Sequence, residues 1–242
     1  MTVQIIEIMG RSKQGVTRPF ICRGDDDNIY FVKGIGAGRR SQVYEWIAGN
    51  LATELSLPIA PFKIVDVPIE LIEGNQQYRE LGAGPAFGSL KQTIMELNYA
   101  GIERVPDELQ LDVLAFDWWI RNEDRTLSES GGNPNLFWNP SQEKLVVFDH
   151  NQAFDHNFSD DDFTKYHVFN LQQHSLFGDA LYRQQYENNF QSALNQWHNI
   201  QDSIPEEWKF LDEELTISAN IDLDAIFNTL NRCNTGKLWS PS

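Results

Sequence analysis

Short runs of β-branched and aromatic residues recur in the first third of the chain, separated by polar stretches that contain glycine. The runs are residues 3–8 (VQIIEI), 29–32 (IYFV) and 62–67 (FKIVDV). Their composition and length predict β-strands. Strand character also resumes at residues 20–22, after a polar stretch that holds Gly10 and Gly15, so the first two runs predict a β-hairpin with a mobile tip.

Residues 41–56 show a helical period, because apolar side chains recur every four positions at Val43, Ile47, Leu51 and Leu55. Ser41 is expected to cap the start of this helix. Together with the strands, the helix predicts a small sheet packed on one helix in the first part of the chain.

The pattern changes at residues 74–92, a glycine-rich stretch that predicts a linker or a close-packed loop between two lobes. A buried helix is expected over residues 106–120, where Pro106 and two acids precede an almost wholly apolar end. The apolar residues 145–148 predict a buried strand, and most of the remaining chain is helical in pattern.

Composition narrows the class of protein. The 242 residues carry 19 Lys and Arg against 35 Asp and Glu, for a formal net charge of −16. Neutralising phosphates requires basic residues, so we expect no direct nucleic acid partner and no membrane partner. At 41% hydrophobic with 7 Trp, the chain can fill a sizeable core and is expected to fold as one large domain or two small lobes.

Two cysteines, Cys22 and Cys233, lie near opposite ends of the sequence. This spacing indicates neither a disulfide framework nor a zinc knuckle, and reduced thiols are expected. No apolar run approaches the length of a membrane-spanning helix, and the N-terminus lacks the order of a signal peptide. We therefore expect a cytoplasmic protein.

Four polar residues in the second part follow the ends of predicted elements: Asp124, Asn133, Asn135 and Asp149. Phosphoryl transfer needs one carboxylate to orient the attacking hydroxyl. It also needs a carboxylate and an amide oxygen to hold Mg²⁺ on the nucleotide phosphates. Two acids and an Asn match this requirement. Asp149 is the firmest of the set, since an acid that closes an apolar run is costly to bury without a cation or donors.

Structural roles compete with these interpretations. Asp124 beside Arg125 is equally consistent with an ion pair or a helix C-cap, and the Asn133-Pro134-Asn135 segment with a simple turn. The acids and histidines from Asp149 onward do not show the tight ligand spacing of a zinc site, so Mg²⁺ at Asp149 is preferred.

The first part offers the complementary charge. Lys33 ends a predicted strand and Glu45 lies on the following helix, the relation by which kinases fix a lysine against nucleotide phosphates. Residues 10–17, at the tip of the predicted hairpin, occupy the place of a nucleotide-covering loop. Taken alone, a lysine at a strand end and a single glutamate on a helix are more often solvated surface charges.

The motifs NEDRT, GGNPNLFW and LVVFDHNQAF, together with YFVKG, YEWIAGNLATELSLPIAP and GPAFGS, follow one another along the chain. In this order and spacing they resemble the small HipA-like kinases, relatives of the serine/threonine kinase toxin HipA and distantly of phosphatidylinositol kinases. The resemblance covers roughly residues 10–155.

The resemblance implies a bilobal, protein-kinase-like α+β fold. A small β-rich N-lobe with one helix is expected over residues 1–74, and a mostly helical C-lobe over residues 75–242. The 242 residues leave no room for the extra N-terminal subdomain of the full toxin, so a role of that subdomain in partner binding is not carried over.

The resemblance also implies roles for single residues. Asp124 takes the place of the catalytic base, and Asn135 and Asp149 take the places of the metal ligands. Lys33 is expected to hold phosphates, with Glu45 positioning it.

Further residues are implied to bind the nucleotide. Ser12, Gly15 and Thr17 belong to the loop that encloses the phosphates, and the backbone from Glu70 to Ile72 is expected to form the hinge that meets adenine. The loop after Asp124 is longer than in the larger relatives, so Asn133 competes with Asn135 as metal ligand. We prefer Asn135, because an apolar strand follows it directly.

These expectations predict an ATP- and Mg²⁺-dependent kinase, most simply one that modifies Ser or Thr on a protein. One alternative is a kinase of the same fold that acts on a small molecule or a lipid headgroup, because fold does not fix substrate. Another is a nucleotide-binding pseudokinase that acts as a partner-binding module, including with an antitoxin-like partner.

Overall fold

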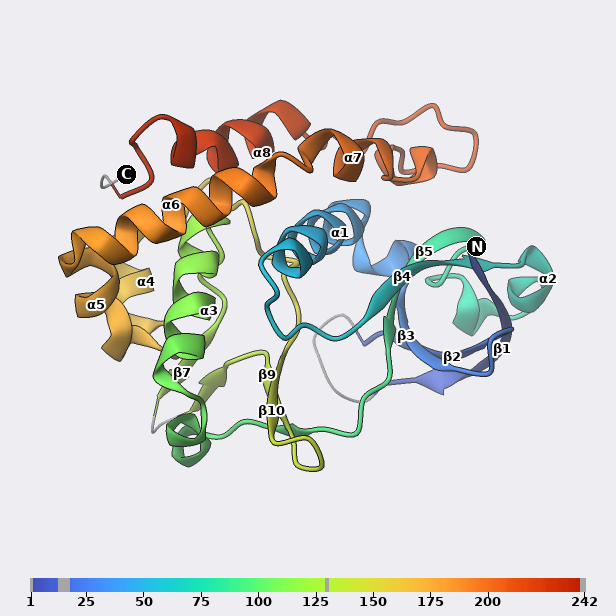
Figure 1. Cartoon of the computed structure of the whole chain (residues 1–242). Coiled ribbons are helices and arrows are strands. Elements are labelled where there is room, and N and C mark those ends of the chain that lie inside the picture. Colours follow the sequence, from blue (N-terminus) through green and yellow to red (C-terminus); the bar gives the residue numbers. More distant parts are fainter. Residues whose placement is uncertain (1, 13–17, 129–130, 240–242) are drawn as a thin grey trace. The chain divides into compact units, whose positions relative to one another are not determined.

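A computed structural model describes residues 2–12, 18–128 and 131–239. The chain mixes strands and helices and divides into two compact units (Figure 1). The barrel unit comprises Met1–Trp46, Ala60–Thr93 and Ser203–Ile221, and the helical unit comprises Ile47–Ile59, Ile94–Asp202 and Asp222–Ser242. Each unit is therefore built from separate stretches of chain, unlike the single boundary expected after residue 74.

The barrel unit contains a closed five-stranded barrel with the strand order β1-β2-β3-β5-β4. The strands are β1 (Val3–Arg11), β2 (Phe20–Gly24), β3 (Ile29–Lys33), β4 (Phe62–Val67) and β5 (Gly84–Leu90). All neighbours are antiparallel except β1 and β4, which pair in parallel. Alternate side chains of β2 and β3, including Cys22, Tyr30 and Val32, point into a buried apolar core. The barrel is closed by hydrogen bonds along every strand.

Strand β5 lies in the stretch that was expected to be a linker. It pairs with both β3 and β4, and it therefore completes the barrel. Gly88 marks a close approach, because a Cβ at this position would overlap the side chain of Val65. Glycine within a strand often marks such a close approach. Because glycine is also typical of loops, the composition of this stretch did not predict a strand.

The remaining elements of the barrel unit are short, apart from the helix α1. They are η1 (Ile35–Ala37), α1 (Arg39–Glu54, whose last residues belong to the helical unit), α2 (Ile69–Ile72), η2 (Gln76–Tyr78) and η5 (Glu206–Lys209). The helix α1 begins two residues before Ser41, so the prediction of Ser41 as its cap was wrong. Ser41 is instead buried within the first turn of the helix.

The helical unit holds one three-stranded sheet with the order β10-β9-β6 and a two-stranded sheet of β7 and β8. Its strands are β6 (Met95–Glu96), β7 (Thr126–Ser128), β8 (Gly131–Asn133), β9 (Leu136–Asn139) and β10 (Lys144–Val147). Its helices are η3 (Tyr99–Arg104), α3 (Asp107–Trp119), α4 (Asp160–Tyr166), η4 (Asn170–Gln172), α5 (Gln173–Gly178), α6 (Ala180–Leu194), α7 (Trp197–Asp202), α8 (Leu223–Leu230) and η6 (Asn231–Asn234).

The predicted buried helix corresponds to α3. Trp119 at its end is fully buried and stacks on Phe190 of α6, with 4.4 Å between the ring centroids. Its indole N–H donates to the carbonyl oxygen of Leu230 at the end of α8, at 2.8 Å. A large aromatic ring with a satisfied polar atom thus anchors α6 and α8 to α3. Among the described residues, no helix is both long and apolar enough to cross a bilayer.

The strand β3 ends where the chain packs closely against a neighbouring segment. A Cβ on Gly34 would overlap the carbonyl oxygen of Leu81, and the next residue, Ile35, donates its N–H to that same oxygen. Gly34→Ala is therefore expected to lower the free energy of unfolding by about 1–3 kcal/mol, as overpacking does. Chemical denaturation measures the change. The control is Gly178→Ala, where a Cβ meets nothing within 4 Å; equal stability of the two variants would contradict the prediction.

Candidate active site

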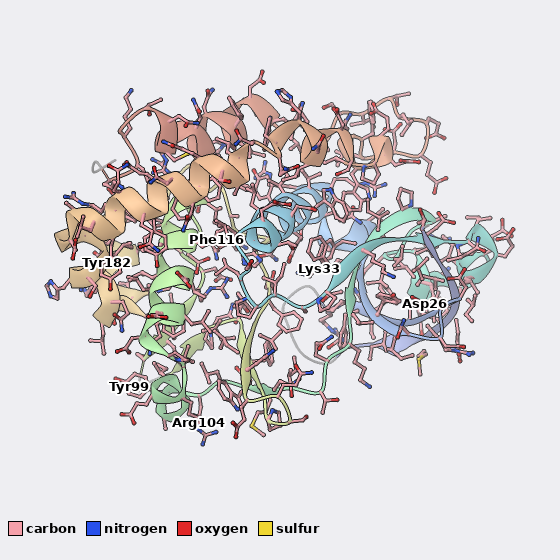
Figure 2. All side chains as sticks on the ribbon, in the orientation of Figure 1. Asp26, Lys33, Tyr99, Arg104, Phe116 and Tyr182 are labelled. Carbon is pink, nitrogen blue, oxygen red and sulfur yellow. The ribbon has the colours of Figure 1, made fainter. Side chains whose placement is uncertain are left out.

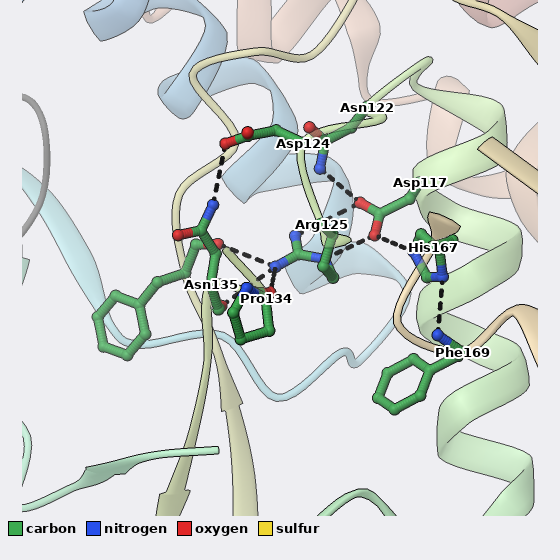
Figure 3. Close-up of polar contacts among 9 residues, drawn as sticks. Asp117, Asn122, Asp124, Arg125, Pro134, Asn135, His167 and Phe169 are labelled. Atoms are coloured by element: carbon green, nitrogen blue, oxygen red, sulfur yellow. Dashed lines mark hydrogen bonds and ion pairs between the residues drawn. The ribbon is translucent and has the colours of Figure 1, made fainter. Parts of the chain in front are cut away.

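A buried carboxylate organises the residues between α3 and β10. Asp117 of α3 is fully buried and accepts hydrogen bonds from the Arg125 guanidinium, at 2.6 Å from Nε and 3.4 Å from Nη2. It also accepts from the amide nitrogen of Asn122 at 2.8 Å. His167 lies 3.0 Å away through its Nε2 atom (Figure 3). These contacts satisfy a charge that would otherwise be very costly to bury.

The hydrogen bonds fix the tautomer of His167. Its Nδ1 atom accepts from the backbone N–H of Phe169 at 3.1 Å, so Nε2 carries the proton and donates to Asp117. Burial lowers the pKa of His167 below its usual value, although Asp117 opposes the shift. Burial alone would raise the pKa of Asp117, but Arg125 and His167 hold it well below its usual value. The network therefore consists of an ionised Asp117, a charged Arg125 and a neutral His167.

Arg125 also forms hydrogen bonds with two further segments of the chain, at residues 134–135 and at Phe148. Its Nη1 atom donates to the carbonyl oxygens of Pro134 and Asn135, both at 3.1 Å, and of Phe148 at 3.2 Å. These residues directly precede or include two of the predicted site residues, Asn135 and Asp149. One buried guanidinium thus ties the loop after α3 to the start of β9 and to the end of β10.

The hairpin of β9 and β10 places Asn135 beside the chain that enters Asp149. Leu136 pairs with Val147 in the ladder, and one step further the N–H of Phe148 donates to the carbonyl oxygen of Asn135 at 3.0 Å. Asn135 and Asp149 both have a left-handed backbone, with φ of 48° and 56°. Asn and Asp are among the few residues that tolerate this conformation, and such backbones cluster at functional sites.

Asp124 faces both asparagines. Its Oδ2 atom accepts from the side-chain amide of Asn133 at 3.1 Å and from that of Asn135 at 3.2 Å. Burial raises the pKa of Asp124, the charge of Asp149 raises it further, and the two amides only partly offset the shift. The predicted base and the predicted metal ligands therefore belong to one cluster in the helical unit.

The donor set of this cluster suits a hard divalent cation. Asp124 and Asp149 are close enough for their charges to repel, and a cation would relieve this repulsion. Carboxylate and amide oxygens are the ligands that Mg²⁺ prefers. No group of three or more His, Cys, Asp or Glu side chains with metal-binding geometry occurs in the described parts of the chain.

The predicted lysine pair lies in the barrel unit. Lys33, at the end of β3, forms an ion pair with Glu45 of α1, and Figure 2 shows Lys33 beside this helix. The side chains are only 12% and 5% exposed, so the two charges are largely removed from water. Neither is a solvated surface charge. The role of this pair in phosphate binding stays a prediction.

Of the three residues predicted in the phosphate-enclosing loop, only Ser12 is among the described residues. Gly15 and Thr17 lie outside the described residues. Ser12 is described, and its N–H donates to the carbonyl oxygen of Pro19, which joins the two sides of the β1–β2 connection.

The segment from Glu70 to Ile72 does not have the properties expected of a hinge. It is helical, Glu70 is exposed, and the carbonyl oxygen of Ile72 already accepts from the N–H of Asn75. The side chain of Ile72 packs against the barrel core. From Ala60 to Thr93, and so on both sides of this segment, the chain belongs to the barrel unit. Glu70–Ile72 is thus part of a short helix in the barrel unit, and its contact with adenine stays a prediction.

Sequence reasoning missed Asp117 and His167. Asp117 stands in a nearly apolar stretch, and an acid in such a stretch was a usable signal, because burial requires partners. His167 gave no local signal, since it meets Asp117 only through the fold, 50 residues apart.

Comparison with known proteins identifies the class. The crystal structure of a Helicobacter pylori proinflammatory kinase, CtkA, has a similar fold, with a TM-score of 0.56 over 99% of this chain and 98% of that chain at 11% sequence identity. The sequence profile described as HipA-like kinase matches residues 5–242. The chain therefore belongs to the HipA-like kinase family, as its motifs predicted, and it is a kinase. Membership in a kinase family implies the use of ATP. No curated protein matches the sequence at a significant level.

Removing one partner of the buried pair leaves the other charge uncompensated. Asp117→Asn is therefore expected to lower the free energy of unfolding by about 3–5 kcal/mol. Chemical denaturation measures this loss. The control is Glu206→Gln, which removes an exposed ion pair with Lys209 and is expected to cost about 1 kcal/mol or less. Similar losses in the two variants would show that the Asp117 network is not a stabilising centre.

His167 predicts a dependence of stability on pH. Its pKa is lowered in the folded state, so between about pH 7 and its folded pKa the unfolded chain binds a proton that the folded chain does not. Stability is thus present at neutral pH and is lost as the pH falls, by at most about 1.4 kcal/mol per pH unit. Unfolding free energies at pH 7, 6 and 5 should fall more steeply for wild type than for His167→Gln. Parallel curves would contradict the assignment of a neutral His167.

Proposed function

We propose that the protein transfers the γ-phosphate of ATP, with Mg²⁺, to a hydroxyl group, most simply that of Ser or Thr on a protein. The observation that carries this proposal is that Asp124 is hydrogen-bonded to Asn135 and lies close enough to Asp149 for their charges to repel, while Arg125 fixes the backbone at Asn135 and Phe148. One carboxylate is left to act on the acceptor, while a second carboxylate and an amide form a metal-binding pair.

Asp124 is the proposed base. Its raised pKa makes it a better proton acceptor than an ordinary aspartate. The amides of Asn133 and Asn135 both donate to Oδ2, so they fix the orientation of the carboxylate. In this role Asp124 orients the acceptor hydroxyl and takes its proton as the phosphoryl group moves.

Asp149 and Asn135 would hold the metal. Asn135 uses its amide nitrogen toward Asp124, which leaves its amide oxygen for a cation. Bound Mg²⁺ would neutralise charge that develops on the phosphate oxygens. Asn133 is the weaker candidate, because it is exposed on β8, whereas the backbone of Asn135 is fixed by Arg125 and Phe148.

Lys33 is proposed to contact the nucleotide phosphates. Its ion pair with Glu45 fixes the position of the ammonium and compensates part of the cost of its burial. In protein kinases the corresponding lysine and glutamate must be paired for activity. The family membership and the largely desolvated pair together support this role.

The acceptor class rests on the family resemblance and on charge. A formal net charge of −16 would steer a basic acceptor toward the protein. A basic small molecule would be favoured by the same field, so the test includes both classes of acceptor.

The test is transfer from γ-labelled ATP to arrayed Ser, Thr and Tyr peptides, aminoglycosides and phosphoinositides. Asp124→Asn and Asp149→Asn are each expected to reduce transfer by at least about a hundredfold, the usual contribution of a base or a metal ligand. Glu143→Gln is the matched control, because it neutralises an exposed carboxylate in the turn between β9 and β10 of the same unit.

Transfer that survives in both Asp variants would refute the mechanism. Transfer to a small molecule or a lipid headgroup alone would keep the mechanism and replace the acceptor. Tight binding of Mg-ATP measured by calorimetry, without transfer to any acceptor, would instead indicate a pseudokinase.

A further inference from the structure

Two residues of α1 hold Lys33 at two different atoms. Glu45 pairs with the ammonium group, and the side-chain Nε2 atom of Gln42 donates to the backbone carbonyl oxygen of Lys33 at 2.8 Å. Gln42 and Glu45 are three positions apart, so they lie on the same face of the helix. The side chain of Lys33 is therefore fixed at its base as well as at its tip.

Gln42 is fully buried and uses both ends of its amide. Its Oε1 atom accepts from Nη1 of Arg39 at 3.0 Å, while its Nε2 atom faces the Lys33 carbonyl. A guanidinium can only donate and a carbonyl can only accept, so this orientation of the amide is the one that satisfies both contacts. No other common side chain of this size can accept from Arg39 and donate to Lys33 at the same time.

Arg39 extends the connection to a distant part of the sequence. Its Nε atom donates to the backbone carbonyl oxygen of Phe210 at 3.0 Å. Arg39 is only 8% exposed, and burial lowers its pKa while Glu207 opposes the shift. Arginine nevertheless stays charged in proteins, so its donors remain available.

The segment that receives Arg39 is itself ordered. Phe210 forms a β-bridge with Ser218, the N–H of Leu211 donates to the carbonyl oxygen of Ile217, and the N–H of Ala219 donates to that of Lys209, both at 2.8 Å. Lys209–Ala219 is therefore a small hairpin. A chain of hydrogen bonds runs from this hairpin through Arg39 and Gln42 to Lys33, and all of its members lie in the barrel unit.

We propose that Gln42 and Arg39 are positioning residues for Lys33: they anchor the base of the lysine to the Lys209–Ala219 hairpin, so that the ammonium stays paired with Glu45. Their effect on catalysis rests on the proposed function, in which Lys33 contacts phosphates. Their effect on Lys33 itself does not, and the two can be measured separately.

The experiment compares wild type with Gln42→Met and Gln42→Glu in the full chain. Methionine removes both hydrogen bonds at similar volume, and glutamate keeps the acceptor for Arg39 but loses the donor to Lys33. The first readout is acetylation of Lys33 by an amine-reactive ester, followed by peptide mass spectrometry with the exposed Lys63 and Lys144 as internal references. Both variants are expected to label Lys33 at least about threefold faster, because the ammonium is no longer held at Glu45.

The second readout is kinetic. Since the proposed contact of Lys33 with phosphates exists before and during transfer, losing its position should raise KM for ATP about fivefold to tenfold and change kcat much less. A purely structural role would instead change KM and kcat together, in proportion to the loss in melting temperature.

Arg39→Lys, which cannot reproduce the Nε contact with Phe210, should shift both readouts in the same direction by less. It also serves if a Gln42 variant fails to fold.

Ser203→Ala is the matched control. It removes the acceptor of a 2.9 Å hydrogen bond from Trp46 of the same helix and lies in the same C-terminal segment of the barrel unit as Phe210, but it is not part of the chain of hydrogen bonds from Phe210 to Lys33. Its Lys33 labelling and KM should equal those of wild type.

Unchanged labelling of Lys33 in the variants of Gln42 and Arg39 would overturn the proposal even if the enzyme transfers phosphate. Faster labelling in an enzyme that shows no phosphate transfer would support the positioning role and refute the proposed function instead.

Discussion

The ion pair of Asp117 and Arg125 is the constraint on which the candidate site depends. Both side chains have no exposed surface, and a buried pair is tolerated only when further hydrogen bonds compensate the loss of water. Here the compensation comes from the site itself, because Arg125 uses its spare donors on the carbonyl oxygens of Pro134, Asn135 and Phe148. The hydrogen bonds that compensate the burial of Arg125 are therefore also the ones that fix the backbone of the candidate site.

Local chemistry was predictable from the sequence. The strand that ends at Lys33, the helix that carries Glu45 and the apolar run before Asp149 each have a clear period or composition, and the structure contains the corresponding β3, α1 and β10. The pairing of Lys33 with Glu45 followed from a relation between neighbouring elements. Fewer long-range features were predictable. The composition of β5, which contains two glycines, did not indicate a strand; one of them, Gly88, allows a close approach to Val65 of β4.

The choice between Asn133 and Asn135 shows where sequence reasoning ends. Both are amides in one loop, and both donate to the same oxygen of Asp124. The two residues differ in their backbone contacts. The carbonyl oxygen of Asn135 accepts from Arg125 and from Phe148, whereas Asn133 lies in the exposed strand β8, which pairs with the short strand β7. The segment Glu70–Ile72 is a second example. Its composition did not predict the short helix α2, in which main-chain groups form hydrogen bonds with one another.

The two units use a common device. In each, a buried arginine donates to a main-chain carbonyl oxygen. Arg125 thereby fixes Asn135 and the residue before Asp149, whereas Arg39 contacts Phe210 and is connected to Lys33 through Gln42. Arginine suits this task because it stays charged when buried and presents several donors in a rigid plane. A carbonyl acceptor belongs to no particular residue type, so these contacts leave no pattern in the partner sequence. The sequence around a contacted carbonyl group therefore does not reveal which arginine contacts it.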